Sequence, residues 1–373
     1  MLSGGIRVFL ASFLPSSPSG INDLNLYFSQ STSTQCDMTL SSLNYDLLTT
    51  IFRNLLPTDP TLLPRVEVVL GRKQLRNLAL ICRSFRDPAL DCLWTCLESL
   101  MPLVKVLPGL KVVNNAFYFD ETIVDDSPFR HFALRVRILD MRTLASQQST
   151  ARISPHLYVL IARELGGQPL LPNLRKIYFG APDDSTHEFA TLPLLFSSGV
   201  QEVHFHGETL SSPLFANYCL PLASRQLTSI RALSLKSKRN VSSAILDAVL
   251  QMRNLHVLDL QLPTIDLKPN ELEKLGKGLK NLTALTLDLH FPSHPASPSS
   301  NPQAPEPGVF TKLTSFHAMT SLTVVLSRSI SSSNYFEPLA KTLAGIQTLR
   351  TLWDTYTGKI TGDIPAESHW ITQ

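Results

Sequence analysis

A short pattern of apolar residues returns at intervals through the last two thirds of the chain and limits the folds that the chain can adopt. Each block has an apolar residue, two others, an apolar residue, one other and a third apolar residue. Seven blocks begin at Val136, Leu174, Val200, Ile230, Leu255, Leu282 and Leu313, and a weaker eighth begins at Ile346. After a first interval of 38 residues, the remaining blocks of these seven begin 25 to 31 residues apart. Such a period predicts stacked structural repeats.

Stretches with the spacing of helices lie between several blocks, at residues 157–165, 245–250 and 272–279. Parallel strands need a crossover of about a dozen residues or more, and these intervals are long enough to supply one. One coil of strand and helix cannot bury its own apolar face, so stability must come from stacking. The sequence therefore predicts an α/β fold with a parallel sheet. The blocks resemble the leucine-rich repeat in degenerate form, which implies an irregular solenoid over residues 109–373.

Residues 38–108 have a different pattern, that of short helices with one apolar stripe each. Asn44 is placed to cap the first helix and Pro57 to stop it, while Pro88 is predicted to separate the second helix from the third. An extra helical turn is expected to end at Gly71. A three-helix bundle of this size buries little apolar area alone, so it needs a partner surface or a following domain.

The order of residues in this region resembles the F-box. An acidic residue precedes paired leucines at 46–48, Ile51-Phe52 follows, and the pattern continues through the apolar run at 78–85 to Leu93-Trp94. Asn44 stands where the family usually has proline, and the interval 57–73 is longer than in the shortest members. The resemblance implies that these helices bind the Skp-family adaptor of an SCF-type ubiquitin ligase, and through it a cullin scaffold. The rest of the chain would then hold a protein substrate for ubiquitination.

The candidates for adaptor contact are the apolar residues on the helical stripes. They are Leu43, Leu47, Leu48, Ile51, Phe52, Leu78, Cys82, Phe85 and Trp94. The same spacing would suit residues of the bundle core, and sequence alone does not separate the two roles. An ordinary helical bundle inside a larger core is the alternative to an F-box.

Side chains alternate across a strand, so the residues between the apolar positions of each block share the opposite face of the sheet. The candidates for substrate binding on that face are Lys176, Tyr178, Glu202, His204, His206, Ser234 and Asp259. The same rule also places Arg142, Lys236 and Gln261 there. Both signs of charge are present, which favours a protein segment of mixed charge as the ligand. His204 and His206 lack a third ligand, so we interpret them as exposed polar residues and not as a metal site.

Composition excludes several classes of function. Lys and Arg number 33 against 30 Asp and Glu, and the basic residues are scattered, which does not favour nucleic acid. No stretch reaches the roughly 18 apolar residues of a membrane helix. The five cysteines form no CxxC pair, and Cys92 and Cys96 are interpreted as small buried side chains, so we expect a reducing compartment, the cytoplasm or nucleus. Neither a metal nor another cofactor is expected.

Residues 1–37 are expected to form a disordered extension, and the stretch at 291–308, rich in proline and serine, an exposed loop. The chain has no nucleophile elbow, zinc-protease motif or phosphate-binding loop, so we do not expect an enzyme. Two alternatives stay open. One is a repeat scaffold for protein–protein interaction with no ubiquitin-ligase role. The other is a hydrolase in an irregular fold, which would require a nucleophile and a base within hydrogen-bond reach.

Overall fold

The computed structural model describes most of the chain between residues 44 and 356. The described residues are 44–57, 59, 63–107, 110–113, 116–119, 128–142, 152–153, 155–180, 192–239, 241–262, 269–289, 315–326 and 351–356. The predicted extension at 1–37, the candidate Leu43 and the predicted loop at 291–308 lie outside them. The chain forms two compact units: a first unit of residues 1–140 and 149–173, and a second unit of residues 141–148 and 174–373. The predicted α/β class with a mostly parallel sheet is confirmed.

The first unit contains helices α2 to α7 and two small groups of strands. The helices are α2 (Tyr45–Arg53), α3 (Arg65–Ile81), α4 (Arg83–Thr95), α5 (Met101–Val104), α6 (Pro128–Ala133) and α7 (Pro155–Glu164). β1 (Cys96–Leu97) pairs in parallel with β4 (Ile138–Asp140). β3 (Ala116–Phe119) lies between antiparallel β2 (Leu110–Val113) and parallel β5 (Arg152–Ile153).

Helix α2 begins where the sequence predicts. The side chain of Asn44 accepts a hydrogen bond from the backbone N–H of Asp46 at 3.0 Å, and Asp46 lies in the first turn, where the helix dipole favours negative charge. The helix ends at Arg53, before Pro57. Leu48 and Phe52 are buried at 2% and 3% exposure, one turn apart, so this stripe faces the bundle core.

Helix α3 is longer than predicted, because it continues through Gly71 instead of ending there. Glycine in a helix interior usually costs stability relative to alanine, so its presence needs a reason. A Cβ atom at this position would overlap the backbone carbonyl oxygen of Leu55 and lie 3.5 Å from the Cβ of Leu56. Gly71 therefore allows α3 to cross closely over the chain that follows α2.

The predicted break at Pro88 is wrong. Helix α4 runs from Arg83 through Pro88 to Thr95, and the break between α3 and α4 lies at Cys82, whose φ and ψ of −152° and 166° are extended. Pro88 is the sixth residue of α4, so one backbone hydrogen bond near the start of that helix is missing, and the buried ring contributes apolar surface in its place. The third predicted helix also ends earlier than its apolar stripe, since Cys96 and Leu97 form β1.

Two aromatic pairs pack between these helices. Phe52 of α2 meets Phe85 of α4 edge to face, with ring centroids 5.5 Å apart. Trp94 of α4 stacks on Phe132 of α6 at 4.5 Å, and both are buried. Offset aromatic pairs of this kind add to the energy of apolar burial. The core of the first unit therefore joins the helices of the bundle to α6.

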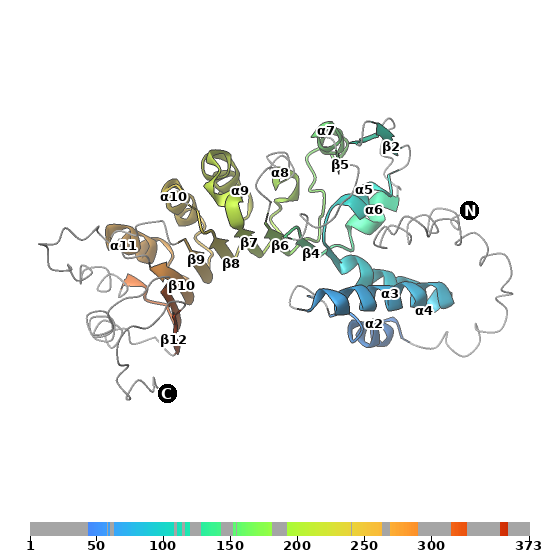
Figure 1. The fold of residues 1–373 in the computed structure, drawn as a ribbon, viewed down its shortest axis with the longest axis horizontal. Coiled ribbons are helices and arrows are strands. Elements are labelled where there is room, and N and C mark those ends of the chain that lie inside the picture. Colours follow the sequence, from blue (N-terminus) through green and yellow to red (C-terminus); the bar gives the residue numbers. More distant parts are fainter. Residues whose placement is uncertain are drawn as a thin grey trace, which may run out of the picture. The chain divides into compact units, whose positions relative to one another are not determined.

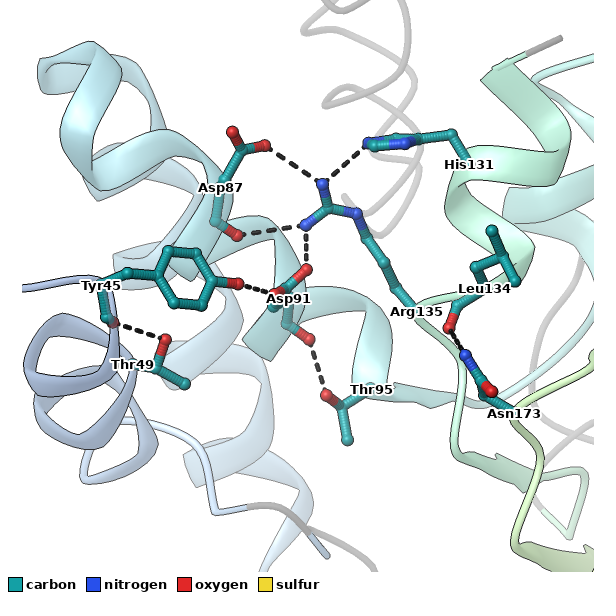
Figure 2. A network of polar contacts seen from close by, with 9 residues as sticks. All are labelled: Tyr45, Thr49, Asp87, Asp91, Thr95, His131, Leu134, Arg135 and Asn173. Carbon is teal, nitrogen blue, oxygen red and sulfur yellow. Dashed lines mark hydrogen bonds and ion pairs between the residues drawn. The ribbon is translucent and has the colours of Figure 1, made fainter. Parts of the chain in front are cut away.

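A polar network joins the same elements at the edge of this core (Figure 2). The guanidinium of Arg135, which follows α6, forms an ion pair with Asp91 of α4 and a second with Asp87 at 3.1 Å. The hydroxyl of Tyr45 in α2 donates to the other oxygen of Asp91. Arg135 also lies 2.8 Å from Nε2 of His131. The side chain of Arg135 is only 11% exposed, so its charge depends on these partners.

The second unit repeats one strand and one helical segment. Its strands are β6 (Lys176–Phe179), β7 (Glu202–His206), β8 (Ala232–Lys236), β9 (Val257–Gln261), β10 (Ala284–Leu289), β11 (Ser321–Leu326) and β12 (Thr351–Tyr356). The segments between them include α8 (Leu192–Leu195), α9 (Leu220–Gln226), α10 (Ala244–Leu250) and α11 (Pro269–Gly278), with a 3₁₀ helix at Gly207–Ser211 and a π-helix at Phe215–Cys219. Figure 1 shows α9, α10 and α11 along one side of these strands.

Each strand of the second unit pairs in parallel with the next one in the sequence. The register keeps the apolar positions of successive blocks opposite one another. The first such row is Ile177, Val203, Leu233, Leu258, Leu285 and Leu322, all buried. The predicted blocks therefore mark the strands β6 to β10 correctly, and the predicted helices at 245–250 and 272–279 are present as α10 and α11.

The last two predicted blocks are displaced. The block at Leu313 predicted a strand beginning near Ser315, but β11 begins at Ser321, and His317 and Ala318 lie in a turn. β12 begins at Thr351, and its pairing with β11 places Leu352 opposite Leu322. This strand therefore also begins later than the block at Ile346 predicts. The segment at 321–326 contains Thr and Val, residue types that prefer strands. The block at Leu313 fits the apolar spacing but lacks this preference.

Asparagine side chains tie neighbouring coils together. The amide of Asn254 donates to the carbonyl of Thr228 at 2.8 Å, and the amide of Asn281 donates to that of Arg253 at 3.3 Å. In the first unit Asn173 bonds the carbonyl of Leu134 at 2.7 Å. Each asparagine stands directly before the first apolar residue of a block. These bonds satisfy carbonyl groups in the turns of the preceding coil, which regular secondary structure leaves without partners.

The close crossing at Gly71 leads to a prediction. We expect Gly71→Ala to destabilise the first unit by about 1–3 kcal/mol, because the added methyl group must push α3 away from Leu55. Asn77→Ala, at an exposed position of the same helix, should be neutral or slightly stabilising. Urea denaturation of both variants would measure the difference. An increase in stability for Gly71→Ala would show that the crossing is not tight.

The network around Arg135 leads to a second prediction. Arg135→Met should cost about 1–3 kcal/mol, since Asp91 and Asp87 lose their shared cation, although solvent screens the more exposed Asp87. Arg137→Met removes an exposed cation nearby and should change the free energy of unfolding by less than about 0.5 kcal/mol. A double-mutant cycle with Asp91→Asn measures the coupling. Additive effects of Arg135→Met and Asp91→Asn would contradict an energetic link between α4 and the segment after α6.

Candidate functional site

The candidate site is the face of the second unit's sheet that carries polar residues between the buried apolar rows. Strand pairing arranges these residues in lines across the strands. The middle line is Tyr178, His204, Ser234, Asp259 and Thr286, each the register partner of the next. Lys176 and Glu202 pair on the side of the strand starts, and His206, Lys236 and Gln261 on the side of the strand ends. Parallel pairing therefore brings all seven predicted substrate-binding residues to one face.

One end of this face is an aromatic stack. The rings of Tyr178 and His204 lie parallel within 10°, with centroids 4.4 Å apart. The guanidinium carbon of Arg142 lies 4.5 Å from the centroid of the Tyr178 ring. Tyr178 is 7% exposed, so its ring forms the floor under Arg142 and is not itself a contact surface. The Tyr178 ring therefore holds the guanidinium of Arg142 above the sheet.

Glu202 connects two basic side chains. Its carboxylate lies 2.9 Å from the Lys176 ammonium and 2.8 Å from Nε2 of His204. The hydrogen bond from His204 and the interaction with Lys176 hold the pKa of Glu202 below its usual value, against the opposing effect of burial. Glu202 therefore stays ionised and neutralises the Lys176 side of the face.

Asp259 connects three further groups. It accepts from the Lys236 ammonium at 2.9 Å, from the Ser234 hydroxyl at 3.0 Å and from the Gln261 side-chain amide at 3.1 Å. Ser234 is buried, and its hydroxyl donates to this carboxylate. Ser234 therefore lacks the hydrogen bond to a histidine base that a nucleophilic serine requires. The predicted alternative of a hydrolase finds no such pair among the described polar residues of this face.

His206 has surroundings on this face that disfavour its protonated form. Its Nε2 atom is buried and has no hydrogen-bond partner. Burial, followed by the positive charges of Lys236, His204 and Arg142, lowers the pKa of His206 to about 4, and only Asp259 acts in the opposite direction. The imidazole is therefore neutral at neutral pH.

The structure divides the predicted adaptor-binding residues into two groups. Leu48, Phe52 and Trp94 are buried in the bundle, and Leu78, Cys82 and Phe85 are half-buried. Leu47 and Ile51 are 49% and 46% exposed, one turn apart on α2, so they form an apolar stripe on the outside of the helix. Leu47 and Ile51 are thus the members of this set, within the described residues, that a partner could contact without rearrangement.

Three residues of the face were not among the predicted substrate-binding residues. Arg142, Lys236 and Gln261 contact selected residues directly, through Tyr178 and Asp259. Their strand positions placed them on the surface, but only the register shows that they share ion pairs and stacks with the selected residues. Three of the four residues at 236–239 are basic, and Lys236 among them forms an ion pair with Asp259 on the face.

Cys92 and Cys96 are buried as predicted. Cys92, Cys96 and Cys219 are buried and have free thiols, and burial raises the pKa of the first two to about 11 and about 12. No group of three metal-ligating side chains occurs among the described residues. In the same part of the chain, the helices are all too short or too polar to span a bilayer.

No protein-family model matches the chain, and a search of curated proteins finds no match.

The environment of His206 predicts a dependence of stability on pH. Its pKa is about 4 in the folded chain and about 6.5 in an unfolded one, so the unfolded state binds more protons between these values. Stability from this residue is thus present above about pH 6.5 and lost as the pH falls towards 4. We expect His206→Gln to flatten the decline in urea midpoint between about pH 6.5 and 5. Parallel curves for the two proteins would contradict the prediction.

Proposed function

We propose that the chain is the substrate-recognition subunit of an SCF-type ubiquitin ligase. In this proposal α2, α3 and α4 form an F-box that binds a Skp-family adaptor, and through it a cullin scaffold. The second unit is an irregular leucine-rich-repeat solenoid whose polar sheet face binds a protein substrate. Both compartments in which such ligases work, the cytoplasm and the nucleus, suit a chain with free cysteines.

The observation that carries the proposal is the apolar stripe of Leu47 and Ile51 on α2. Leu48 and Phe52 supply the fully buried contacts of this helix with the core, whereas about half of the surface of Leu47 and Ile51 stays exposed. Paired leucines followed by Ile51-Phe52 are the residues that carry the F-box resemblance. Exposed apolar side chains on a small bundle favour a docking role, and here the resemblance identifies the partner as the adaptor.

The repeats support the second half of the proposal. Strands of the second unit pair with their sequence neighbours, each connection from β6 to β10 carries a helical segment, and the apolar block repeats in register. Such an array presents one long polar face on the side opposite the described helices α9, α10 and α11, which suits the binding of an extended surface or segment of a protein. The pairs Glu202–Lys176 and Asp259–Lys236 each place a negative and a positive group on the face. This arrangement suits a ligand of mixed charge.

The proposed mechanism is proximity and needs no chemistry by the chain itself. One surface binds the adaptor and the other binds the substrate, which raises the effective concentration of substrate lysines near a ubiquitin-loaded enzyme. Rate acceleration then comes from the shared assembly. The chain contributes selection, since only proteins that bind the repeat face are presented.

The adaptor contact can be tested by co-purification with a recombinant Skp-family adaptor. We expect the full chain to retain the adaptor and the double variant Leu47→Asp, Ile51→Asp to lose at least about tenfold in affinity, since two apolar contacts become charged and unpaired. Both residues are exposed, so the bundle should stay folded, which circular dichroism would check. Leu48→Asp or Phe52→Asp would be uninformative, because those side chains are in the core.

A matched control distinguishes specific binding through Leu47 and Ile51 from unspecific apolar association. Val159→Asp places the same charge at a 66% exposed position of α7 and should retain the adaptor fully. Equal recovery of the wild-type chain and the double variant, or of neither, would overturn the F-box proposal. The chain would then be interpreted as a repeat scaffold, whose protein ligands bind without an adaptor.

A further inference from the structure

Helix α3 carries apolar residues on two opposite sides. Val68, Gly71, Leu75 and Ala79 are buried on one side of the helix. At 3.6 residues per turn, a second set of residues falls on the opposite side, which we call the outer face of α3. Its apolar members are 46% to 79% exposed, and they are Val66, Val69, Leu70, Leu80 and Ile81. Lys73 and Asn77, both exposed, lie between them.

The outer face extends over almost the whole of α3. From residue 66 to residue 81 it is about 22 Å long, or about four helical turns. Single exposed apolar side chains are common on protein surfaces, but contiguous apolar patches mark interaction sites. A helix that is apolar on all sides usually lies inside a core, whereas α3 has only one side buried. The outer face therefore has the character of a surface that a partner covers.

Lys73 stands in the middle of the outer face and has no acidic neighbour on the helix. The residues three and four positions away are Val69, Leu70, Arg76 and Asn77, and none of them carries a carboxylate. Within the part of the chain that the structure describes, the Lys73 ammonium forms no hydrogen bond or ion pair. Burial of an unpaired cation is costly, so a partner that covers the apolar residues must supply a carboxylate at this point.

The position of Lys73 also disfavours two other occupants. If α3 paired with a second copy around a two-fold axis, the middle of the face would meet itself, and the two ammonium groups would repel each other. Helices that lie on membranes carry their cations on the polar side, whereas Lys73 lies within the apolar stripe. In pairs of protein helices, one polar residue within an apolar stripe specifies the register and the partner.

We propose that the outer face of α3 is a docking surface for an amphipathic helix of a partner protein, with an apolar stripe and an acidic residue opposite Lys73. Burial of the apolar residues supplies most of the binding energy. The pair of Lys73 with the partner's carboxylate sets the register and selects against helices that lack the acidic residue. None of the residues of the outer face is among those assigned to the adaptor or the substrate, so the inference goes beyond the proposed function.

The charge requirement can be tested on the full chain with two designed helical peptides of the same length as α3. Both carry the same leucine stripe, and the residue at the centre of that stripe is glutamate in one peptide and lysine in the other. We expect fluorescence anisotropy to show at least about tenfold tighter binding of the glutamate peptide. Lys73→Glu should reverse this preference, while Lys105→Glu, at an exposed position outside α3, should preserve it. Equal binding of the two peptides, or binding of neither, would overturn the inference.

The apolar requirement can be tested with Leu70→Asp. This variant should weaken binding of the glutamate peptide by at least about tenfold, because a buried apolar contact becomes charged. Val159→Asp places the same charge at a 66% exposed position of α7 and should leave the affinity unchanged. Circular dichroism checks that both variants are folded. Equal binding by Leu70→Asp and the wild-type chain would contradict docking on the outer face.

The same variant identifies other occupants. A dimer of the wild-type chain in sedimentation equilibrium that Leu70→Asp dissociates would assign the outer face to a second copy. Binding to vesicles of phosphatidylserine and phosphatidylcholine that Leu70→Asp abolishes would assign it to a membrane, and loss of the recombinant adaptor would assign it to the adaptor. Each of these results would overturn the inference. The adaptor test of the proposed ligase role depends on Leu47 and Ile51, so its failure would be seen separately.

Discussion

Parallel pairing of sequence-adjacent strands is the constraint on which the second unit depends. Every connection must return to the start of the sheet, and the described helices α9, α10 and α11 lie along one side of it (Figure 1). That side buries the apolar rows that begin at Ile177 and Phe179, while the other carries the polar lines. A strand order that doubled back would have brought connections to both faces and covered Tyr178, His204 and Asp259. The position of the candidate site follows from topology before any single contact is considered.

Charge compensation decides what this open face can do. Its carboxylates each hold at least two donors, so the side chains are oriented before a ligand arrives and lose little conformational freedom on binding. The same compensation weakens long-range attraction for any one sign of charge. Lys236 is paired with Asp259 just as Lys176 is paired with Glu202, with 2.9 Å between nitrogen and oxygen in each pair. Selectivity on such a surface comes from local groups and not from its summed charge.

How far sequence could predict this structure depended on whether a feature was local. The cap at Asn44 and the strands β6 to β10 follow from neighbouring residues, and they were predicted correctly. The course of α3 through Gly71 depends on Leu55, which is distant in sequence, and the helical state of Pro88 depends on burial that no window of residues reports. The block at Leu313 failed because apolar spacing alone fits two registers there. In the site, the face of each residue was predictable, but the sharing of Asp259 by Lys236, Ser234 and Gln261 needed the register of β8 against β9.

The asparagine bonds between neighbouring coils have a mechanical consequence. Asn254 and Asn281 each fasten their coil to the one directly before it, and neither reaches further. A load applied at the carboxyl end would thus be borne by one junction at a time. Under tension the array should peel in steps of about one coil, 25 to 30 residues of released chain, where a globular core would rupture in a single event. A repeat array built this way could unfold at its carboxyl end while the coils around His204 stay folded.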